Sequence, residues 1–223
     1  MIRLFVFDLG NVILPFDHRQ IPAKLLNWST KKGLFTPEEM FIYLFDWEDG
    51  LINPYEEGYM SSEEFFDTIR QRYSLNMNFE DFKNIWTPIF KEDQEVNKII
   101  LNLKQMGYPL FILSNTNELH FTYIKETYPI VHTFHEWILS YEVHAKKPKK
   151  RIFDEIFNRM DVPRDEVFYI DDTGPYIEQA KAYGLKGTVF TDAENLWRQI
   201  KDIIEYKREP GNIMQLLKSI KDF

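Results

Sequence analysis

The sequence contains no cysteine among its 223 residues. Disulfide bonds, a thiolate nucleophile and cysteine-based zinc sites are therefore excluded, and the composition fits a reducing compartment. Long apolar stretches are also missing, because the run LFVF near the start is closed at once by Asp8 and is too short for a signal peptide or a membrane span. These absences predict a cytoplasmic protein without a membrane partner.

Basic residues are in deficit, with 27 Lys and Arg against 35 Asp and Glu, a net charge of -8 and a pI near 5.2. This balance argues against a nucleic-acid backbone as the partner. An anionic substrate would need a metal ion or a few well-placed cations in its cleft. Hydrophobic residues make up 44% of the chain and aromatic residues 16%, which predicts a packed globular protein.

Four short apolar runs are typical of buried parallel strands, and segments with helical patterns connect them. They are LFVF before Asp8, PLFIL before Ser114, VFYI before Asp171 and GTVF before Thr191, and WIL before Ser140 is a weaker fifth. Two of the connecting segments end at glycines suited to helix caps, Gly107 and Gly184. The pattern predicts an α/β fold with a Rossmann-like, doubly wound parallel sheet.

Between Leu14 and about Glu92 no strand-like run appears, and helix starts recur instead: TPEE, the capping box SSEE, and NFED. We expect residues 15–91 to form an α-helical cap domain, inserted into a core domain made of residues 1–14 and 92–223. Because the insert follows the first strand, it should lie over the carboxyl end of the sheet, where such sheets bind ligands. The last segment, REPGNIMQLLKSIKDF, predicts one more short helix.

Polar residues close the apolar runs: Asp8 after LFVF, Ser114 and Asn115 after PLFIL, and Asp171 and Asp172 after VFYI. Parallel strands bring these ends to one edge of the sheet. Three carboxylates placed together repel one another unless a cation neutralises them. Mg²⁺ suits such oxygen ligands, and Lys147 is a candidate side-chain cation.

In order along the chain, the motifs FDLGN, LSNTN, KKP and IDD resemble those of the haloacid dehalogenase (HAD) superfamily of phosphohydrolases, in its branch with a helical cap (C1). The resemblance runs from residue 1 to about Thr191, and EEGYMSSEEFF is similar to the cap of that branch. It implies that Asp8 attacks phosphorus and forms an aspartyl phosphate, which water then hydrolyses. Ser114, Asn115 and Lys147 would bind the phosphoryl group.

The same resemblance implies a Mg²⁺ site formed by Asp8, the backbone carbonyl of Gly10, Asp172, and Asp171 directly or through water. Two positions depart from the superfamily's pattern. Gly10 stands where most members have an aspartate that protonates the leaving group, and Tyr176 stands where asparagine is usual. Loss of such an acid typically removes roughly 10² to 10⁴ in rate.

A substrate with a good leaving group, such as a sugar 1-phosphate, would need that acid less. The DLGN motif is also similar to that of bacterial α-glucose-1-phosphate phosphatases. Asp17 and His18 are candidate replacements for the missing group.

Simpler interpretations exist for several of these residues. Ser114 can cap the helix that follows it, which is compatible with phosphate binding. Lys146 and the other cations of KKPKKR read as solvated residues at a helix start. The aromatic residues of the insert, Trp47, Phe65 and Phe66, are interpreted as core, with a place in a pocket as the alternative for Trp47.

Three functions compete. The first is a Mg²⁺-dependent phosphatase acting on a small phosphorylated metabolite. The second is a dehalogenase, whose chemistry needs no metal and leaves the paired acids Asp171 and Asp172 unexplained. The third is a non-catalytic or very slow phosphoacceptor or ligand-binding protein, because Gly10 cannot supply acid-base catalysis.

Overall fold

The computed structural model describes residues 1–205. The helix expected near the end of the chain, over residues 208–223, lies outside the described residues. The sheet has five parallel strands in the order β3-β2-β1-β4-β5. Their bounds are β1 Leu4–Phe7, β2 Leu110–Ser114, β3 Glu136–Leu139, β4 Val167–Asp171 and β5 Lys186–Val189. The predicted parallel α/β sheet is confirmed, including its weaker strand before Ser140.

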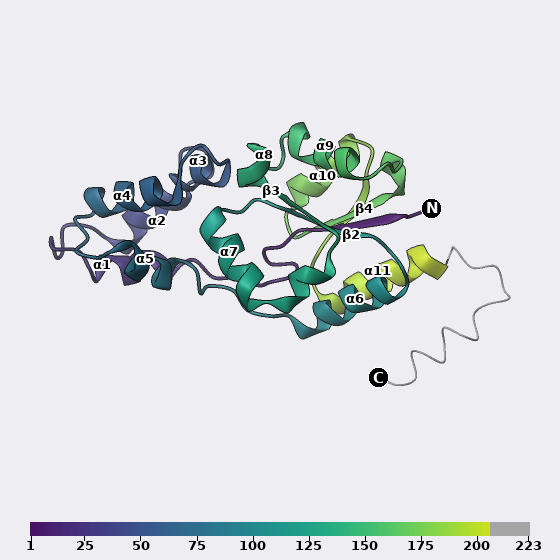
Figure 1. Cartoon of the computed structure of the whole chain (residues 1–223), viewed down its shortest axis with the longest axis horizontal. Helices are drawn as coiled ribbons and strands as arrows, with labels where there is room; N and C mark the ends of the chain where they lie inside the picture. The colour runs from purple at the N-terminus through teal and green to yellow at the C-terminus, as the bar shows by residue number, and fades with distance from the viewer. Residues whose placement is uncertain (206–223) are drawn as a thin grey trace.

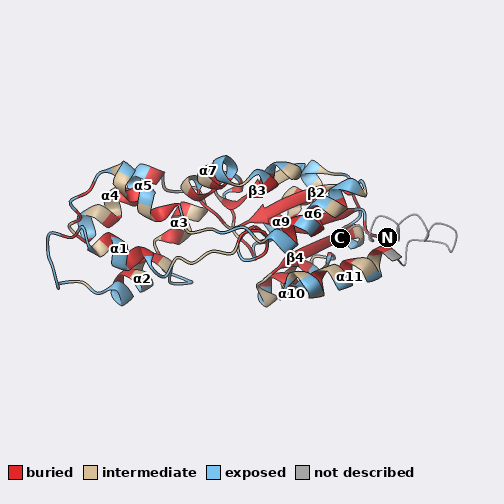
Figure 2. Ribbon diagram, turned by 90° about the horizontal axis from the view of Figure 1, so that it is seen from below, coloured by how far each residue is buried: buried red, intermediate tan, exposed pale blue. Residues whose placement is uncertain are grey.

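Helices cover both faces of the sheet (Figure 1). One face packs on α6 Gln94–Gln105, α7 Glu118–Thr127, the 3₁₀ helix η1 Pro129–Thr133 and α11 Ala193–Glu205; the other packs on α9 Lys150–Arg159 and α10 Gly174–Ala182. The short helices α8 Ser140–Val143 and η2 Arg164–Glu166 lie in the connections. Alternate residues of β1 serve the two faces, since Phe5 and Phe7 join the first core, while Leu4 and Val6 join the second. Figure 2 shows the strands buried between the helix layers.

Five of the six helices between β1 and β2 form a lobe with an apolar cluster of their own. They are α1 Ile21–Leu26, α2 Pro37–Phe45, α3 Ile52–Glu56, α4 Ser62–Arg72 and α5 Phe79–Trp86. Complete capping boxes begin α2 at Thr36, α4 at Ser61 and α5 at Asn78, as the sequence predicts. The predicted core aromatics Phe65 and Phe66 belong to the cluster, where the ring of Phe65 lies edge to face with Trp86 and the ring of Phe66 is tilted against Phe82.

Two segments connect the lobe to the sheet, and they pair with each other. Phe16 and Phe90 form an antiparallel bridge, and the Lys91 amide donates to the Pro15 carbonyl at 2.8 Å. The division of the chain at residues 14/15 and 91/92 stays a prediction. The lobe lies at the end of the sheet where the strands finish, so it is next to the residues that close the strands (Figure 1).

Two expectations about burial are wrong. Strand β5, from the GTVF run, is not buried on both faces: Lys186 and Val189 are exposed, because β5 is an edge strand with β4 as its neighbour. Trp47 does not belong to the core of the lobe, since 68% of its surface is exposed. Within residues 1–205, no helix combines the length and the apolar character needed to cross a membrane.

Candidate active site

The register of the strands brings the predicted acidic residues together. Phe7 is paired with Ile112 on one side and with Ile170 on the other, and the Asp8 amide donates to the Ile170 carbonyl at 2.8 Å. The next residue on β4 is Asp171, so the two carboxylates lie at the ends of neighbouring strands, at the same level. Oxygen atoms of Asp8, Asp171 and Asp172 lie within 4.8 Å of one another.

Lys147 joins two of these acids. Its Nζ lies 2.8 Å from Asp8 Oδ1 and 2.7 Å from Asp171 Oδ2, and it also donates to the Leu113 carbonyl at 3.3 Å. The side chain is 1% exposed. A buried ammonium with this set of oxygen partners is held in place as a fixed positive charge beside Asp8.

Asp171 is fully buried and serves as an anchor. Besides Lys147, its Oδ2 accepts a hydrogen bond from the Tyr169 hydroxyl, and its Oδ1 accepts from the Thr173 amide at 2.7 Å. Asp172 is half-buried at the surface of the cavity and accepts from the Thr173 hydroxyl at 3.3 Å. The two adjacent carboxylates therefore have different surroundings, with Asp172 the more accessible of the pair.

The loop after β2 contributes polar groups to the same place. The amide of Asn115 brackets the backbone of Lys147, since Oδ1 accepts from the Lys147 amide at 2.7 Å and Nδ2 donates to its carbonyl at 3.2 Å. The Asn115 side chain therefore positions the lysine, whereas a phosphoryl-binding role for it stays a prediction. Ser114 is 2% exposed, and its Oγ lies 3.4 Å from the Asn115 carbonyl oxygen.

Burial is the main influence on the acid-base behaviour of this cluster. It raises the pKa of Asp8 to about 7, with Lys147 opposing the rise and Asp171 adding to it. The pKa of Asp172 is raised by burial and by the charge of Asp171. For Lys147, burial lowers the pKa, but the charges of Asp171 and Asp8 outweigh it and hold the pKa above its usual value. The lysine is therefore charged at neutral pH.

The donor set fits a hard divalent cation. It offers carboxylate oxygens only, and when all three acids are ionised they exceed the single charge of Lys147 by two units. Mg²⁺ prefers such ligands and commonly uses one or two carboxylates together with water and substrate phosphate. The cluster of Asp8, Asp171 and Asp172 could hold this ion. The part assigned to the Gly10 carbonyl stays a prediction.

The position of the missing acid is filled by an aromatic ring. A Cβ atom built on Gly10 would lie 2.7 Å from Cε1 of Phe16, closer than real Cβ contacts allow. Of the two proposed replacements, Asp17 is bound to Arg19, at 2.8 Å from Nε, and does not line the cavity. His18 does line it, with its ring centroid 4.5 Å from that of Phe45, and burial lowers its pKa, so it is neutral at neutral pH.

A cavity of about 290 Å³ connects the acidic cluster with the lobe. Its lining from the lobe includes Trp47, Asn53 and Glu56, and its lining from the core includes Lys146. Tyr176 stands beneath the lobe, where its hydroxyl lies 3.4 Å from Asn115 Nδ2 and its ring stacks on Trp47 with centroids 6.0 Å apart. Tyr176 therefore links the loop after β2 to the lobe.

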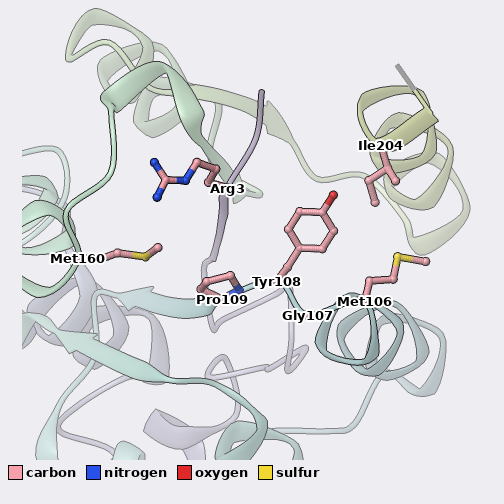
Figure 3. Close-up of a pocket in the computed structure, with 7 residues that line it drawn as sticks. All are labelled: Arg3, Met106, Gly107, Tyr108, Pro109, Met160 and Ile204. Atoms are coloured by element: carbon pink, nitrogen blue, oxygen red, sulfur yellow. The ribbon is translucent and has the colours of Figure 1, made fainter. Parts of the chain in front are cut away.

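A second cavity, of about 460 Å³, lies at the opposite end of the sheet (Figure 3). It is lined by Arg3, Met106, Gly107, Tyr108, Pro109, Met160 and Ile204. None of these lining residues is acidic, and none follows the carboxyl end of a strand. This larger cavity therefore lacks the groups that the chemistry requires, and the smaller one is the candidate active site.

Sequence reasoning missed several residues of the site. Lys146 is not a solvated cation, because its side chain is 18% exposed and bound to Glu56 in the cavity. The only feature of the sequence that pointed to Lys146 was its position next to Lys147. Phe16 and Tyr169 had no signal, since their roles depend on neighbours distant in the sequence.

Comparisons with known proteins give the family and the fold of this chain. The family model described as haloacid dehalogenase-like hydrolase matches residues 54–190. D-ribitol-5-phosphate phosphatase of Bacteroides thetaiotaomicron is 27% identical over 211 residues, which cover 92% of this chain and 98% of the relative.

Among solved structures, a HAD family enzyme of Bacteroides thetaiotaomicron in complex with magnesium and inorganic phosphate superposes with a TM-score of 0.74 and 23% identity, covering 86% of this chain and 95% of that one. A HAD-like family hydrolase of Porphyromonas gingivalis also gives a TM-score of 0.74 at 23% identity, over 92% of this chain and 98% of that one. These structures share the fold of this chain along nearly their whole length.

Proposed function

The chain belongs to the haloacid dehalogenase-like hydrolase family, and from this we propose that it is a Mg²⁺-dependent phosphatase that hydrolyses a small phosphorylated metabolite, such as a sugar phosphate. One observation carries the proposal: Asp8, Asp171, Asp172 and Lys147 meet beside a cavity that the lobe covers. The named activity of the ribitol phosphate phosphatase relative supports it. A cavity of about 290 Å³ suits a small substrate, since larger ligands of drug size occupy roughly 300 to 1,000 Å³.

In the proposed reaction, a carboxylate oxygen of Asp8 attacks the phosphorus atom. The bond from phosphorus to the ester oxygen breaks, and the phosphoryl group is transferred to Asp8 as an aspartyl phosphate. Water then attacks this intermediate and releases inorganic phosphate, which restores the carboxylate. Asp8 must be ionised to attack, so its pKa of about 7 in the metal-free protein sets a limit on the fraction that is ready to react.

The fixed charge of Lys147 acts on both reacting groups, the carboxylate and the phosphate. Its Nζ contacts the attacking carboxylate and would also neutralise charge on the incoming phosphate. Asn115 and Asp171 hold the lysine from its backbone and from its ammonium, respectively. A Mg²⁺ ion held by Asp8 and Asp172, with Asp171 beside them, would supply further neutralisation of the phosphate.

The test is phosphate release from a panel of phosphorylated metabolites, including sugar 1-phosphates and alditol phosphates, with Mg²⁺ or with EDTA. We expect turnover that requires the metal and that falls by roughly 10³-fold or more in Asp8→Asn, because the nucleophile is lost. Release of phosphate by Asp8→Asn at the wild-type rate would contradict the proposal.

A second function is favoured by one specific observation, the ring of Phe16 in the place of an acid at position 10. Without that acid, the protein would act as a slow phosphoacceptor whose aspartyl phosphate persists. Intact-protein mass spectrometry distinguishes the two, because a persistent intermediate adds the mass of one phosphoryl group to the wild type and not to Asp8→Asn. Dehalogenation fits less well, since that reaction needs no metal and does not explain the adjacent acids Asp171 and Asp172. A cytoplasmic location, and the absence of nucleic-acid and membrane partners, stay predictions of the sequence.

A further inference from the structure

A second polar cluster lies in the candidate active site, apart from the acids. Lys146 Nζ is 2.8 Å from Glu56 Oε2 and donates to Asn53 Oδ1 at 2.6 Å. All three residues line the cavity that contains Asp8, and the side chains of Lys146 and Glu56 are 18% and 19% exposed. Glu56 and Asn53 come from α3 of the lobe, and Lys146 comes from the core after α8, beside which α3 lies in Figure 1.

The hydrogen bonds within the cluster leave specific atoms free. An ammonium group has three donors, and Lys146 directs one to Asn53 in a hydrogen bond and one to Glu56 in the ion pair. The amide of Asn53 donates to the carbonyl groups of residues 46–48 at 3.2 to 3.3 Å, so its oxygen is fixed toward the lysine. Within residues 1–205, Glu56 Oε1 accepts no hydrogen bond. One N–H donor and one carboxylate acceptor therefore remain next to each other.

This pair of atoms matches a hydroxyl group, which both donates and accepts. The cluster also has no net charge, because the ammonium of Lys146 balances the carboxylate of Glu56. A carboxylate or a second phosphate on the ligand would be repelled by Glu56, and an amine would be repelled by Lys146. Neutral hydroxyl groups are the substituents that satisfy both residues at once.

An aromatic wall adds to this chemistry. Trp47 is 68% exposed at the cavity and is held by stacking on Tyr176. The face of such a ring suits the C–H groups of a polyhydroxylated carbon chain, whose hydroxyl groups then point away from it. The small volume of the cavity limits the length of that chain.

We propose that Lys146, Glu56 and Asn53 form a hydroxyl-binding subsite that selects monophosphates of small sugars or alditols, with Trp47 covering the carbon chain. The inference rests on the proposed phosphatase activity. It assigns substrate recognition to an ion pair between lobe and core, so a substrate bound there also contacts both parts of the molecule.

The experiment compares a short alditol phosphate with phenyl phosphate, which has no hydroxyl groups. In Lys146→Met and Glu56→Leu, we expect the ratio of the two kcat/KM values to fall by roughly 10- to 100-fold, since a site built for hydroxyl groups loses that discrimination when its polar atoms are removed. The matched controls are Lys149→Met and Glu57→Leu. These residues also form an ion pair between lobe and core but do not line the cavity, so the ratio should stay within about threefold of the wild type.

An equal fall of kcat/KM on both substrates would show that the ion pair only holds the lobe in place. No change of kcat/KM on either substrate would show that the ion pair does not bind a hydroxyl group. Either result overturns the subsite. If the wild type hydrolyses neither these two compounds nor any other member of the panel, the phosphatase proposal fails, and calorimetric titration of the same two compounds tests the subsite separately. There, a preference for the alditol phosphate that is lost in Glu56→Leu supports it, and equal binding of both compounds by the wild type contradicts it.

Discussion

The ring of Phe16 occupies the space into which a side chain at position 10 would point. Gly10 is therefore part of a packed pair, and a change at this position affects Phe16 as well. Phe16 also packs near Phe90, with centroids 5.8 Å apart, where the two connecting segments pair. A single substitution at Gly10 consequently disturbs the connection between lobe and core.

We expect Gly10→Asp alone to lower the free energy of unfolding by about 1–3 kcal/mol, the usual cost of overpacking, and to give no gain in turnover. Gly10→Asp combined with Phe16→Ala has room for the carboxyl group. On an alditol phosphate its kcat should exceed that of Phe16→Ala by roughly tenfold or more, because general acid catalysis contributes about 10²–10⁴ when well placed. Urea unfolding and steady-state kinetics measure the two effects.

Phenyl phosphate is the control substrate for this comparison, since its leaving group needs little protonation. An equal gain on phenyl phosphate would mean that the new carboxyl group acts in some way other than as an acid. If Gly10→Asp alone is as stable as the wild type, the ring of Phe16 does not restrict this position.

The meeting of Asp8, Asp171 and Asp172 could be predicted from the sequence, because each follows a buried apolar run and parallel strands end at one edge. The environment of Lys146 could not be predicted. Its partners Glu56 and Asn53 lie about 90 positions earlier in the chain, and pairing across that distance is decided by how the lobe packs. The local sequence pattern predicts where a residue lies in its strand or helix, whereas the contacts between elements distant in the sequence are known only from the tertiary structure.

At the scale of elements, the helix starts at Thr36, Ser61 and Asn78 were predictable because a capping box is closed within four residues. The exposure of β5 was not predictable, because an apolar run does not indicate whether a further strand lies beside it in the sheet. Contacts between the lobe and α7 were equally hidden. The Tyr55 hydroxyl lies 2.8 Å from Ser62 Oγ, which donates to Glu118 Oε2 at 2.6 Å, and the Leu119 amide donates to Tyr55 at 3.3 Å.

Tyr55 thus joins α3 and α4 of the lobe to the start of α7 in the core, which follows the strand that ends at Ser114. Tyr55→Phe would leave the Leu119 amide and Ser62 without this partner in a buried place. We expect the free energy of unfolding to fall by about 1–3 kcal/mol, the cost of unsatisfied buried polar groups, as measured by urea unfolding. The matched control is Tyr59→Phe, whose hydroxyl bonds to the His144 carbonyl at the surface and whose loss should cost less than about 0.5 kcal/mol. Equal effects of the two changes would contradict this role for Tyr55.

At the scale of the whole molecule, charge is distributed unevenly. The chain carries a net charge of -8, and three of its acids lie together in the active site, where they repel an anionic substrate. Lys147 offsets only one of those negative charges. Binding of a divalent cation would therefore stabilise the folded protein by relieving repulsion at the place where lobe and core meet, and would also admit the phosphate.

This linkage gives a pH dependence whose sign follows from Asp8. Burial raises its pKa to about 7, so at pH 6 most metal-free molecules carry a proton there that Mg²⁺ must displace, whereas at pH 8 most do not. For one such group, the dissociation constant for Mg²⁺ should be about tenfold larger at pH 6 than at pH 8, and the raised pKa of Asp172 acts in the same direction.

Calorimetric titration with Mg²⁺ at the two pH values, in buffers of different ionisation enthalpy, measures both the affinity and the protons released. Asp8→Asn has no group to titrate at this position, so its weaker binding should lose most of the pH dependence. A dissociation constant that is equal at pH 6 and pH 8 in the wild type would mean that Asp8 is already ionised without the metal. The charge of Lys147 would then outweigh the burial of Asp8, and the nucleophile would be ready to react before any cation binds.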